Sequence, residues 1–335
     1  MTPKQRFESS IRFRQPDDMV AMMEVEFQLY KGIAGREPIV GFEFANLTPS
    51  EKEGALAYNA ELMVETARLC GHDAIRDFGG YWELWPGQPA YLWLPDEQSR
   101  LGQIRALKRA AGDEFFILGS LCATMGMPDG DGIEDFVISL FDAPDEVKKG
   151  NEERLESTKR LQGLMLDAGA DGILSCCDVA YKSGPFISPA MMDEFFFPYL
   201  NRWAESLGPV ISIWHTDGNL KPVLDRIIES GVSAIQCVDP LADMDIVEIK
   251  KACDGKLALI GNIDSGLLET GSADDVRGEV RRVVEGCKYG GGFVLGVCNA
   301  VYRGIPVGNY RAYCDARVEF GGYINSYLSK KYVDK

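Results

Sequence analysis

Short apolar runs alternate with longer amphipathic segments along the whole chain. The apolar runs have the length and composition of β-strands and fall at Val20–Phe27, Asp73–Phe78, Phe115–Leu121, Gly172–Cys177, Pro209–Trp214, Ser233–Cys237, Leu257–Gly261 and Gly292–Val297. Helical patterns lie between most of them and after the last, at Ser50–Cys70, Glu97–Ala111, Pro144–Leu166, Pro189–Leu207, Leu220–Glu229, Met244–Cys253, Ala273–Cys287 and Asn309–Leu328. This alternation predicts a closed, parallel (β/α)₈ barrel, the TIM-barrel fold. Pro38–Phe44 also has the pattern of a strand, which leaves the strand count open by one.

The composition fits one large domain, residues 1–335, in which an N-terminal extension precedes the barrel. Hydrophobic residues make up 46% of the chain, enough for a large core. Met1–Gln15 is charged and does not resemble a secretory signal, and no run approaches the roughly 20 apolar residues of a membrane span. The net charge of −16 disfavours nucleic acid and anionic membranes as partners. Nine cysteines without a regular framework indicate a reducing, cytoplasmic environment.

Acidic and metal-binding residue types recur where the predicted strands end. These positions are Glu24, Glu26, Asp77, Asp178, His215, Asp217, Asp239, Asn262, Asp264, Cys298 and Asn299. In a (β/α)₈ barrel the carboxyl ends of the strands converge on one face, where catalysis takes place. Branched aliphatic packing does not account for such a set, so we expect a polar site at this face.

His215 is the strongest candidate, because it follows the apolar run Val210–Ile213 directly and the chain has only two histidines. His72 precedes a strand instead, which places it at a helix terminus on the opposite face. His215, Asp217 and Cys298 offer one nitrogen, one oxygen and one sulfur donor, and a catalytic zinc takes about three such ligands. Two simpler interpretations stay open: a rim histidine bonded to backbone and an ordinary buried thiol.

Three further carboxylates are candidates for catalysis. Glu24 and Glu26 share one face of the first predicted strand, because side chains alternate with period two. Facing the interior, they predict a general base or a ligand, and facing outward they are solvated charges. Asp178 ends the fourth predicted strand, where it either orients substrate or forms a rim salt bridge.

The connection between Gly79 and Pro95 is rich in aromatic residues: Tyr81, Trp82, Trp85, Tyr91 and Trp93. It is either a lid or pocket wall, or a segment packed on the barrel rim. The phosphate-binding and nucleophile-elbow patterns GxxxxGK[ST], GxGxxG after a strand and GxSxG are absent from the sequence.

Four segments together resemble the uroporphyrinogen decarboxylase superfamily. They read DAGADGILSCCDVAYKSGPFISPAMMDEFFFPYL, HTDGNLKPVLDRIIESGV, LALIGNIDSGLLETG and GGFVLGVCNAVYRGIPVGN. The resemblance extends over most of the chain and implies a (β/α)₈ barrel. True decarboxylases carry an arginine-containing loop near the N-terminus, where this chain reads VAMMEVEFQLY. Asp77 matches the catalytic aspartate of that branch, but its late-barrel histidine is replaced near Val297 and Cys298.

The other branch of the superfamily contains corrinoid-dependent methyltransferases. Their zinc motif is His-x-Cys with a second cysteine much later, and this chain is similar in His215 and Cys298 but has Asp217 in the place of the first cysteine. The resemblance implies bound Zn²⁺, a partner protein that carries a cobamide, and a small methylated substrate. Glu24 or Glu26 completes the metal site if Asp217 does not. The His-x-Asp-Gly-Asn form resembles members that demethylate small, including methoxylated, compounds.

The sequence therefore predicts a zinc-dependent methyltransferase acting between a small methylated compound and a corrinoid-binding protein. A metal-independent decarboxylase that uses Asp77 is one alternative. A binding barrel whose catalytic site has decayed is another.

Overall fold

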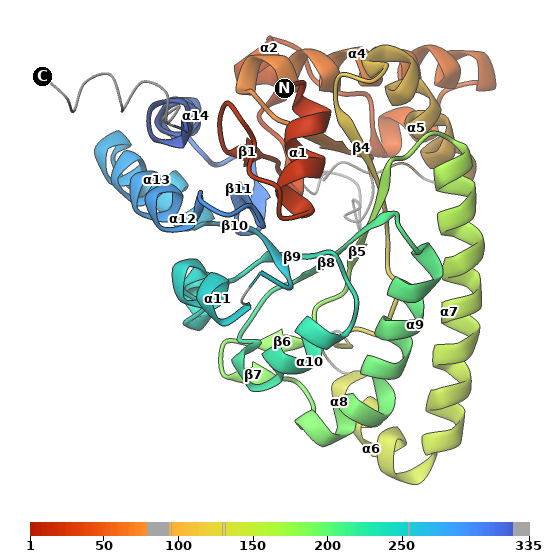
Figure 1. Ribbon diagram of the computed structural model, residues 1–335. Coiled ribbons are helices and arrows are strands. Elements are labelled where there is room, and N and C mark those ends of the chain that lie inside the picture. Colours follow the sequence, from red (N-terminus) through yellow and green to blue (C-terminus); the bar gives the residue numbers. More distant parts are fainter. Residues whose placement is uncertain (79–93, 95, 129, 131, 254, 324–335) are drawn as a thin grey trace, which may run out of the picture.

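The computed structural model describes residues 1–78, 94, 96–128, 130, 132–253 and 255–323 (Figure 1). Within them, eight parallel strands form one sheet, in the order β1-β11-β10-β9-β8-β5-β4-β3. Their bounds are β1 Ala21–Met22, β3 Ala74–Arg76, β4 Phe116–Leu121, β5 Gly172–Cys176, β8 Ile211–Thr216, β9 Ala234–Cys237, β10 Ala258–Ile263 and β11 Phe293–Val297. β1 and β3 are the two edge strands of this sheet. The backbone N–H of Asp73, next to β3, donates to Met22 O of β1 at 2.7 Å and so connects the two edges. The predicted (β/α)₈ barrel is confirmed, in a nearly closed form.

Helices follow the strands and surround them (Figure 1). The longer ones are α4 Pro49–Cys70, α5 Glu97–Ala111, α6 Gly132–Asp142, α7 Pro144–Asp167, α9 Phe197–Leu207, α13 Ala273–Cys287 and α14 Val307–Gly321. The shorter ones are α1 Pro3–Ile11, α2 Tyr30–Ala34, α3 Gly41–Ala45, α8 Pro189–Phe195, α10 Leu224–Glu229, α11 Ile246–Cys253 and α12 Ser265–Thr270, with 3₁₀ turns at Lys221–Val223 and Pro240–Ala242. The helix predicted over Pro189–Leu207 divides at Phe196, because Pro198 has no N–H to continue the ladder.

The first predicted strand is also divided. Only Ala21–Met22 joins the barrel, whereas β2 (Glu26–Phe27) pairs with β12 (Ala300–Val301) in a separate two-stranded sheet. A second small sheet pairs β6 (Ala180–Tyr181) with β7 (Gly184–Pro185). Pro38–Phe44 is not a strand: the Asn59 amide pairs with both backbone groups of Ile39 at 2.8 Å, and α3 begins at Gly41.

The core has an inner and an outer layer. Inside the barrel, small and branched residues of the strands form one buried cluster, and Phe7 and Ile11 of α1 complete it. The Phe7 and Phe116 rings lie 4.9 Å apart, and Phe7 is fully buried, a contribution of about 2 kcal/mol or more from apolar burial alone. Helix α1 thus covers the amino-terminal end of the barrel, which leaves the other end for the site.

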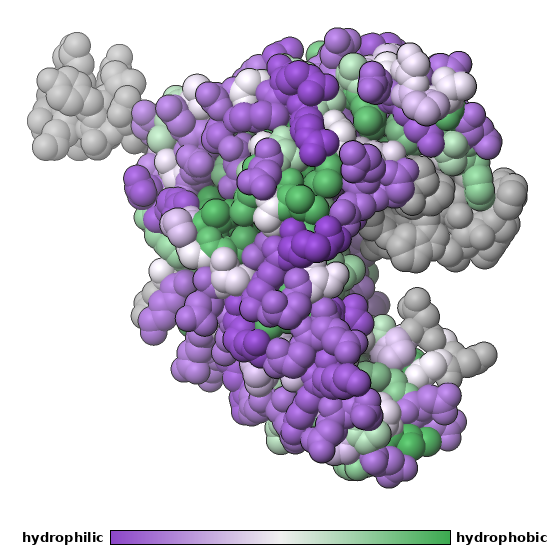
Figure 2. All heavy atoms as spheres, turned by 90° about the vertical axis from the view of Figure 1, so that its right-hand side faces the viewer, coloured by the Kyte–Doolittle hydropathy of each residue, from purple (hydrophilic) through white to green (hydrophobic). Residues whose placement is uncertain are grey.

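The outer surface carries the charged faces of the helices. Hydrophilic residues dominate the lower part of the face in Figure 2, on the side of the molecule where α7 lies. Among the described residues, no helix combines the length and the apolar character that crossing a membrane requires.

Candidate active site at the carboxyl ends of the strands

His215 lies near the end of β8 and is 4% exposed. Its Nδ1 is hydrogen-bonded to Oε1 of Gln236 on β9. The Gln236 amide is oriented, because Nε2 donates to the carbonyls of Val297 (3.1 Å) and Cys298 (3.3 Å). Gln236 Oε1 therefore accepts from Nδ1–H, and Nε2 is the ring nitrogen turned toward the site. This is the arrangement by which proteins orient a histidine that ligates a metal.

His215 Nε2 faces two carboxylates. Asp217 Oδ1 lies 3.8 Å from Nε2 and Asp178 Oδ1 lies 3.9 Å from it. Asp178 Oδ1 also accepts the backbone N–H of Asp217 at 3.0 Å, while Asn299 donates to Asp217 Oδ2 at 2.7 Å. Asp217 Oδ1 is buried, and among the described residues it has no hydrogen-bond partner of good geometry. His215, Asp217 and Asp178 are close enough to hold one metal ion between them.

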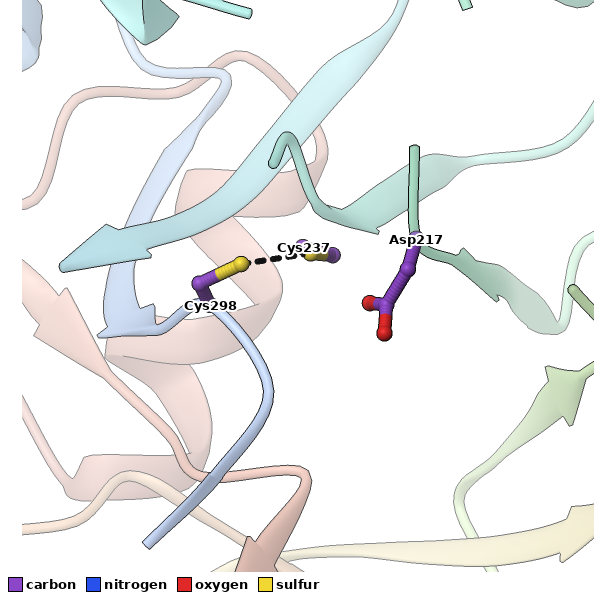
Figure 3. A group of neighbouring side chains, drawn as sticks. All are labelled: Asp217, Cys237 and Cys298. Carbon is purple, nitrogen blue, oxygen red and sulfur yellow. Dashed lines mark hydrogen bonds between the residues drawn. The ribbon is translucent and has the colours of Figure 1, made fainter. Parts of the chain in front are cut away.

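Asp217 belongs to a second group with Cys237 and Cys298, which end β9 and follow β11 (Figure 3). The two sulfur atoms lie 2.7 Å apart, and the Cys298 thiol is 3.9 Å from Asp239 Oδ1. The donor atoms of Asp217, Cys237 and Cys298 lie within 4.8 Å of one another. His215 and Cys298 thus fall into different groups, which Asp217 links.

The environment of this second group disfavours negative charge. Burial raises the pKa of Asp217, and it raises the pKa of Cys237 well above its usual range. The hydrogen bond with Cys237 would lower the pKa of Cys298, but burial and the adjacent Asp239 outweigh it and raise that pKa. A divalent cation reverses this preference, because it favours the ionised forms of the groups that bind it.

A cavity of about 190 Å³ adjoins the His215 group. It is lined by Val25, Glu26, Arg76, Cys122, Cys176, Asp178, His215 and Asn299. Arg76 comes from β3, and its Nη1 donates to Val25 O at 2.7 Å. The lining combines thiol, carboxylate, imidazole and guanidinium groups around a volume suited to a small molecule.

Glu24 and Glu26 are both buried, so the interpretation as solvated surface charges is wrong. They do not share a strand face either, because β1 ends before them and β2 begins at Glu26. Glu26 lines the cavity, and its Oε1 accepts from Gln28 Nε2 at 2.5 Å. Glu24 points to the outer layer, where it accepts from Val297 N at 2.9 Å and from the Tyr310 hydroxyl at 3.1 Å.

Burial raises the pKa of Glu24 to about 7. Between the pKa of an unfolded glutamate and about pH 7, the unfolded chain loses this proton first, so folding stability falls as the pH rises. We expect Glu24→Gln to remove this loss, a relative gain of about 2 kcal/mol between pH 5 and pH 8. Urea unfolding at both pH values measures it. Glu229→Gln, at an exposed position, is the control, and equal slopes for all three proteins would contradict the expectation.

Asp77 lies apart from the 190 Å³ cavity and lines a smaller one of about 40 Å³. Its Oδ1 accepts from the Ser120 hydroxyl at 2.6 Å and its Oδ2 from Arg100 at 3.3 Å. His72 lines that smaller cavity and bonds the Tyr310 hydroxyl at 2.7 Å, at the end of helix α4. The aromatic segment Gly79–Pro95 lies outside the described residues apart from Leu94, so its role stays a prediction.

Three polar residues of this region were not predicted from the sequence: Arg76, Gln236 and Cys237. Arg76 and Gln236 interrupt otherwise apolar strands, a signal that was available. The sequence contains no comparable signal for Cys237, since a cysteine at the end of an apolar run is typical of a buried core position.

The family model of uroporphyrinogen decarboxylase (URO-D) matches residues 101–320, well over half of the chain. The chain belongs to this family. The curated relatives include uroporphyrinogen decarboxylases of Xanthomonas campestris, which are 31% identical over 117 residues. This alignment covers 32% of the chain and 31% of the relative, so it spans about a third of those enzymes.

Among solved structures, a methyltransferase from Methanosarcina mazei is similar over 96% of this chain and 99% of its own, with a TM-score of 0.71 and 19% identity. A Listeria monocytogenes protein described as a vitamin-B12-independent methionine synthase has a TM-score of 0.51 and 14% identity, over 90% of this chain and 96% of its own. At these identities the likeness shows the fold. The family and these neighbours agree on the barrel fold.

Proposed function

We propose that this barrel is a zinc-dependent methyltransferase that moves a methyl group between a small methylated compound and a corrinoid-binding protein. One observation supports this most: two groups of metal-competent side chains share Asp217 beside a cavity at the carboxyl ends of the strands. The structural likeness to a methyltransferase agrees with it.

The donor set fits zinc. His215, Asp217 and Cys298 are the proposed ligands, and they offer the nitrogen, oxygen and sulfur atoms that zinc accepts. The buried Oδ1 of Asp217 has no hydrogen-bond partner of good geometry among the described residues, and Nε2 of His215 faces it at 3.8 Å. When bound there, zinc supplies a Lewis acid that polarises the heteroatom carrying the methyl group, or lowers the pKa of an acceptor thiol.

The remaining residues bind and orient the substrate. Asp178 holds the backbone of Asp217 and borders the cavity, so it accepts a hydrogen bond or a proton from a substrate beside His215. Glu26 faces the same cavity from β2, and burial raises its pKa, which suits a group that exchanges a proton. Glu24 and Asp77 lie behind this layer and act at most as positioning residues.

The partner approaches the open end of the barrel, since α1 covers the other end. A cobamide cofactor is far larger than the 190 Å³ cavity, so it remains with its own protein and meets the substrate at the cavity mouth. The substrate is a small compound for the same reason, and a methoxylated aromatic is one member of the class.

Methyl transfer to Co(I) cobalamin tests the proposal, because the spectrum changes when methylcobalamin forms. We expect stoichiometric zinc in the purified protein and zinc-dependent methylation by at least one donor from a panel of methylated amines, thiols and methoxylated aromatics. Absence of zinc together with inertness toward every donor would overturn it and favour the binding barrel. Release of CO₂ from uroporphyrinogen without metal would favour the decarboxylase, for which Asp77 has both oxygens already bonded.

A further inference from the structure

We propose that Cys237 is a ligand of the same metal, so that the centre contains two sulfur atoms together with Asp217 and His215. The inference rests on the proposed function and deepens it. Its basis is the convergence of three side chains from different strands on one point (Figure 3). Cys237 closes β9, Asp217 follows β8 and Cys298 follows β11.

The distances among Asp217, Cys237 and Cys298 fit one shared ion, whereas His215 reaches this group only through Asp217 and has to move toward it to bind the same ion. Two thiolates on a tetrahedral zinc, with Zn–S bonds of about 2.3 Å, lie roughly 3.7 Å apart. The two sulfurs here lie 2.7 Å apart as hydrogen-bonded thiols, so each needs to move by only about half an ångström. Asp217 Oδ1 contributes a buried acceptor that no described residue satisfies with good hydrogen-bond geometry.

The backbone conformation at Cys237 supports a functional role for this residue. Cys237 has φ = 92° and Val238 has φ = 53°, two consecutive non-glycine residues in the left-handed half of backbone space. Such conformations cost about 1–3 kcal/mol each and gather at functional sites. On the next strand, Gly261 makes the close approach possible, because a Cβ there would lie 2.4 Å from Cys237 O.

Other buried cysteines show the contrast. Cys253 on α11 and Cys287 on α13 are buried among helical apolar residues, and within the described part of the chain neither belongs to a group of metal-competent side chains. They behave as small hydrophobic residues. Cys237 is equally buried but faces another thiol and a carboxylate.

A two-sulfur centre has consequences for chemistry. Two thiolates select zinc-like ions over magnesium or calcium, which prefer oxygen. With Asp217 they supply three ligands, and His215, once it moves toward them, fills the fourth tetrahedral position. The substrate heteroatom then either enters as a fifth ligand or displaces one of the protein ligands.

Cobalt(II) substitution counts the sulfur ligands, because each thiolate adds charge-transfer absorption in the near ultraviolet. We expect Cys237→Ser and Cys298→Ser each to lose about half of this absorption, and Cys287→Ser to keep it. Cys237→Ser at full intensity, with Cys298→Ser reduced, would overturn the role of Cys237 and leave the metal centre standing. Wild-type protein without any sulfur–cobalt absorption would overturn both.

A measurement on the wild-type protein guards against variants that fail to fold. The ¹¹³Cd chemical shift moves downfield with each sulfur ligand, so cadmium-loaded protein reports the number directly. A shift in the range of two sulfur ligands supports the proposal. A shift in the range of one sulfur ligand overturns it.

Discussion

Replacing His215 by alanine is expected to reduce methyl transfer about a thousandfold and to lower the zinc content, because a Lewis acid supplies several kcal/mol of transition-state stabilisation. His215 is buried, its Nδ1 bonds Gln236, and its Nε2 faces Asp217 and Asp178. Without the imidazole, the ion loses its nitrogen ligand and the cavity loses one wall. Metal analysis by mass spectrometry and the Co(I) methylation assay measure the two effects.

Gln236→Leu provides a graded comparison. It keeps the imidazole but removes the acceptor that fixes the Nδ1–H tautomer, and the loss of such an outer partner typically costs 10- to 100-fold in metal affinity. Near-ultraviolet circular dichroism establishes that both variants are folded. Full zinc content and activity within about tenfold of wild type in His215→Ala would contradict the role of His215 as a ligand.

The barrel was predictable because its signal is repeated. Each of the eight barrel strands overlaps a predicted apolar run, although β8 and β10 continue two residues past theirs, and α5 and α13 have the predicted bounds. The predicted elements were wrong where a side chain distant in the sequence binds the backbone. Asn59 caps the extended segment at Ile39, which the local pattern alone cannot reveal. Pro198 is visible in the sequence, but the local pattern does not show where the helix divides. The structure places the break at Phe196, just before the proline.

The candidate site was predictable in part. Position at the ends of strands selected His215, Asp217, Asp178, Glu26 and Cys298, and the structure places all of them at the same end of the barrel. The structure also separates them into two groups, because the direction of a side chain at a strand end depends on the turn that follows. Cys298 meets Cys237 rather than His215, since β11 and β9 both border β10 and their ends converge.

Glu24 and Glu26 show the same limit. Alternation with period two holds only while the chain remains a strand. The chain leaves the barrel after Met22, so the two carboxylates part: one faces Tyr310 of α14 and the other faces the cavity. The sequence left burial of both glutamates open as one of two alternatives. It did not predict that the two side chains would face different regions.

Asp73→Ala is expected to cost about 3–5 kcal/mol of folding stability, because it leaves buried arginine charges without their partner. The Asp73 carboxylate is fully buried. Its Oδ1 pairs with Arg6 of α1, and its Oδ2 accepts from Arg317 of α14 at 2.7 Å and from Met22 N at 2.8 Å. One side chain thus ties both terminal helices to the seam between β1 and β3.

Urea unfolding followed by tryptophan fluorescence measures the loss. Asp113→Ala is the matched control: its side chain is 86% exposed and pairs with Lys108, a surface interaction worth about 0.2–1 kcal/mol. A loss no larger than that of the control would contradict the prediction. Asp73 precedes its strand, whereas Asp178 and Asp217 of the candidate site follow theirs, and in this fold the amino-terminal end serves stability and the carboxyl end serves chemistry. Asp73→Ala should therefore bind zinc as the wild type does below its unfolding transition.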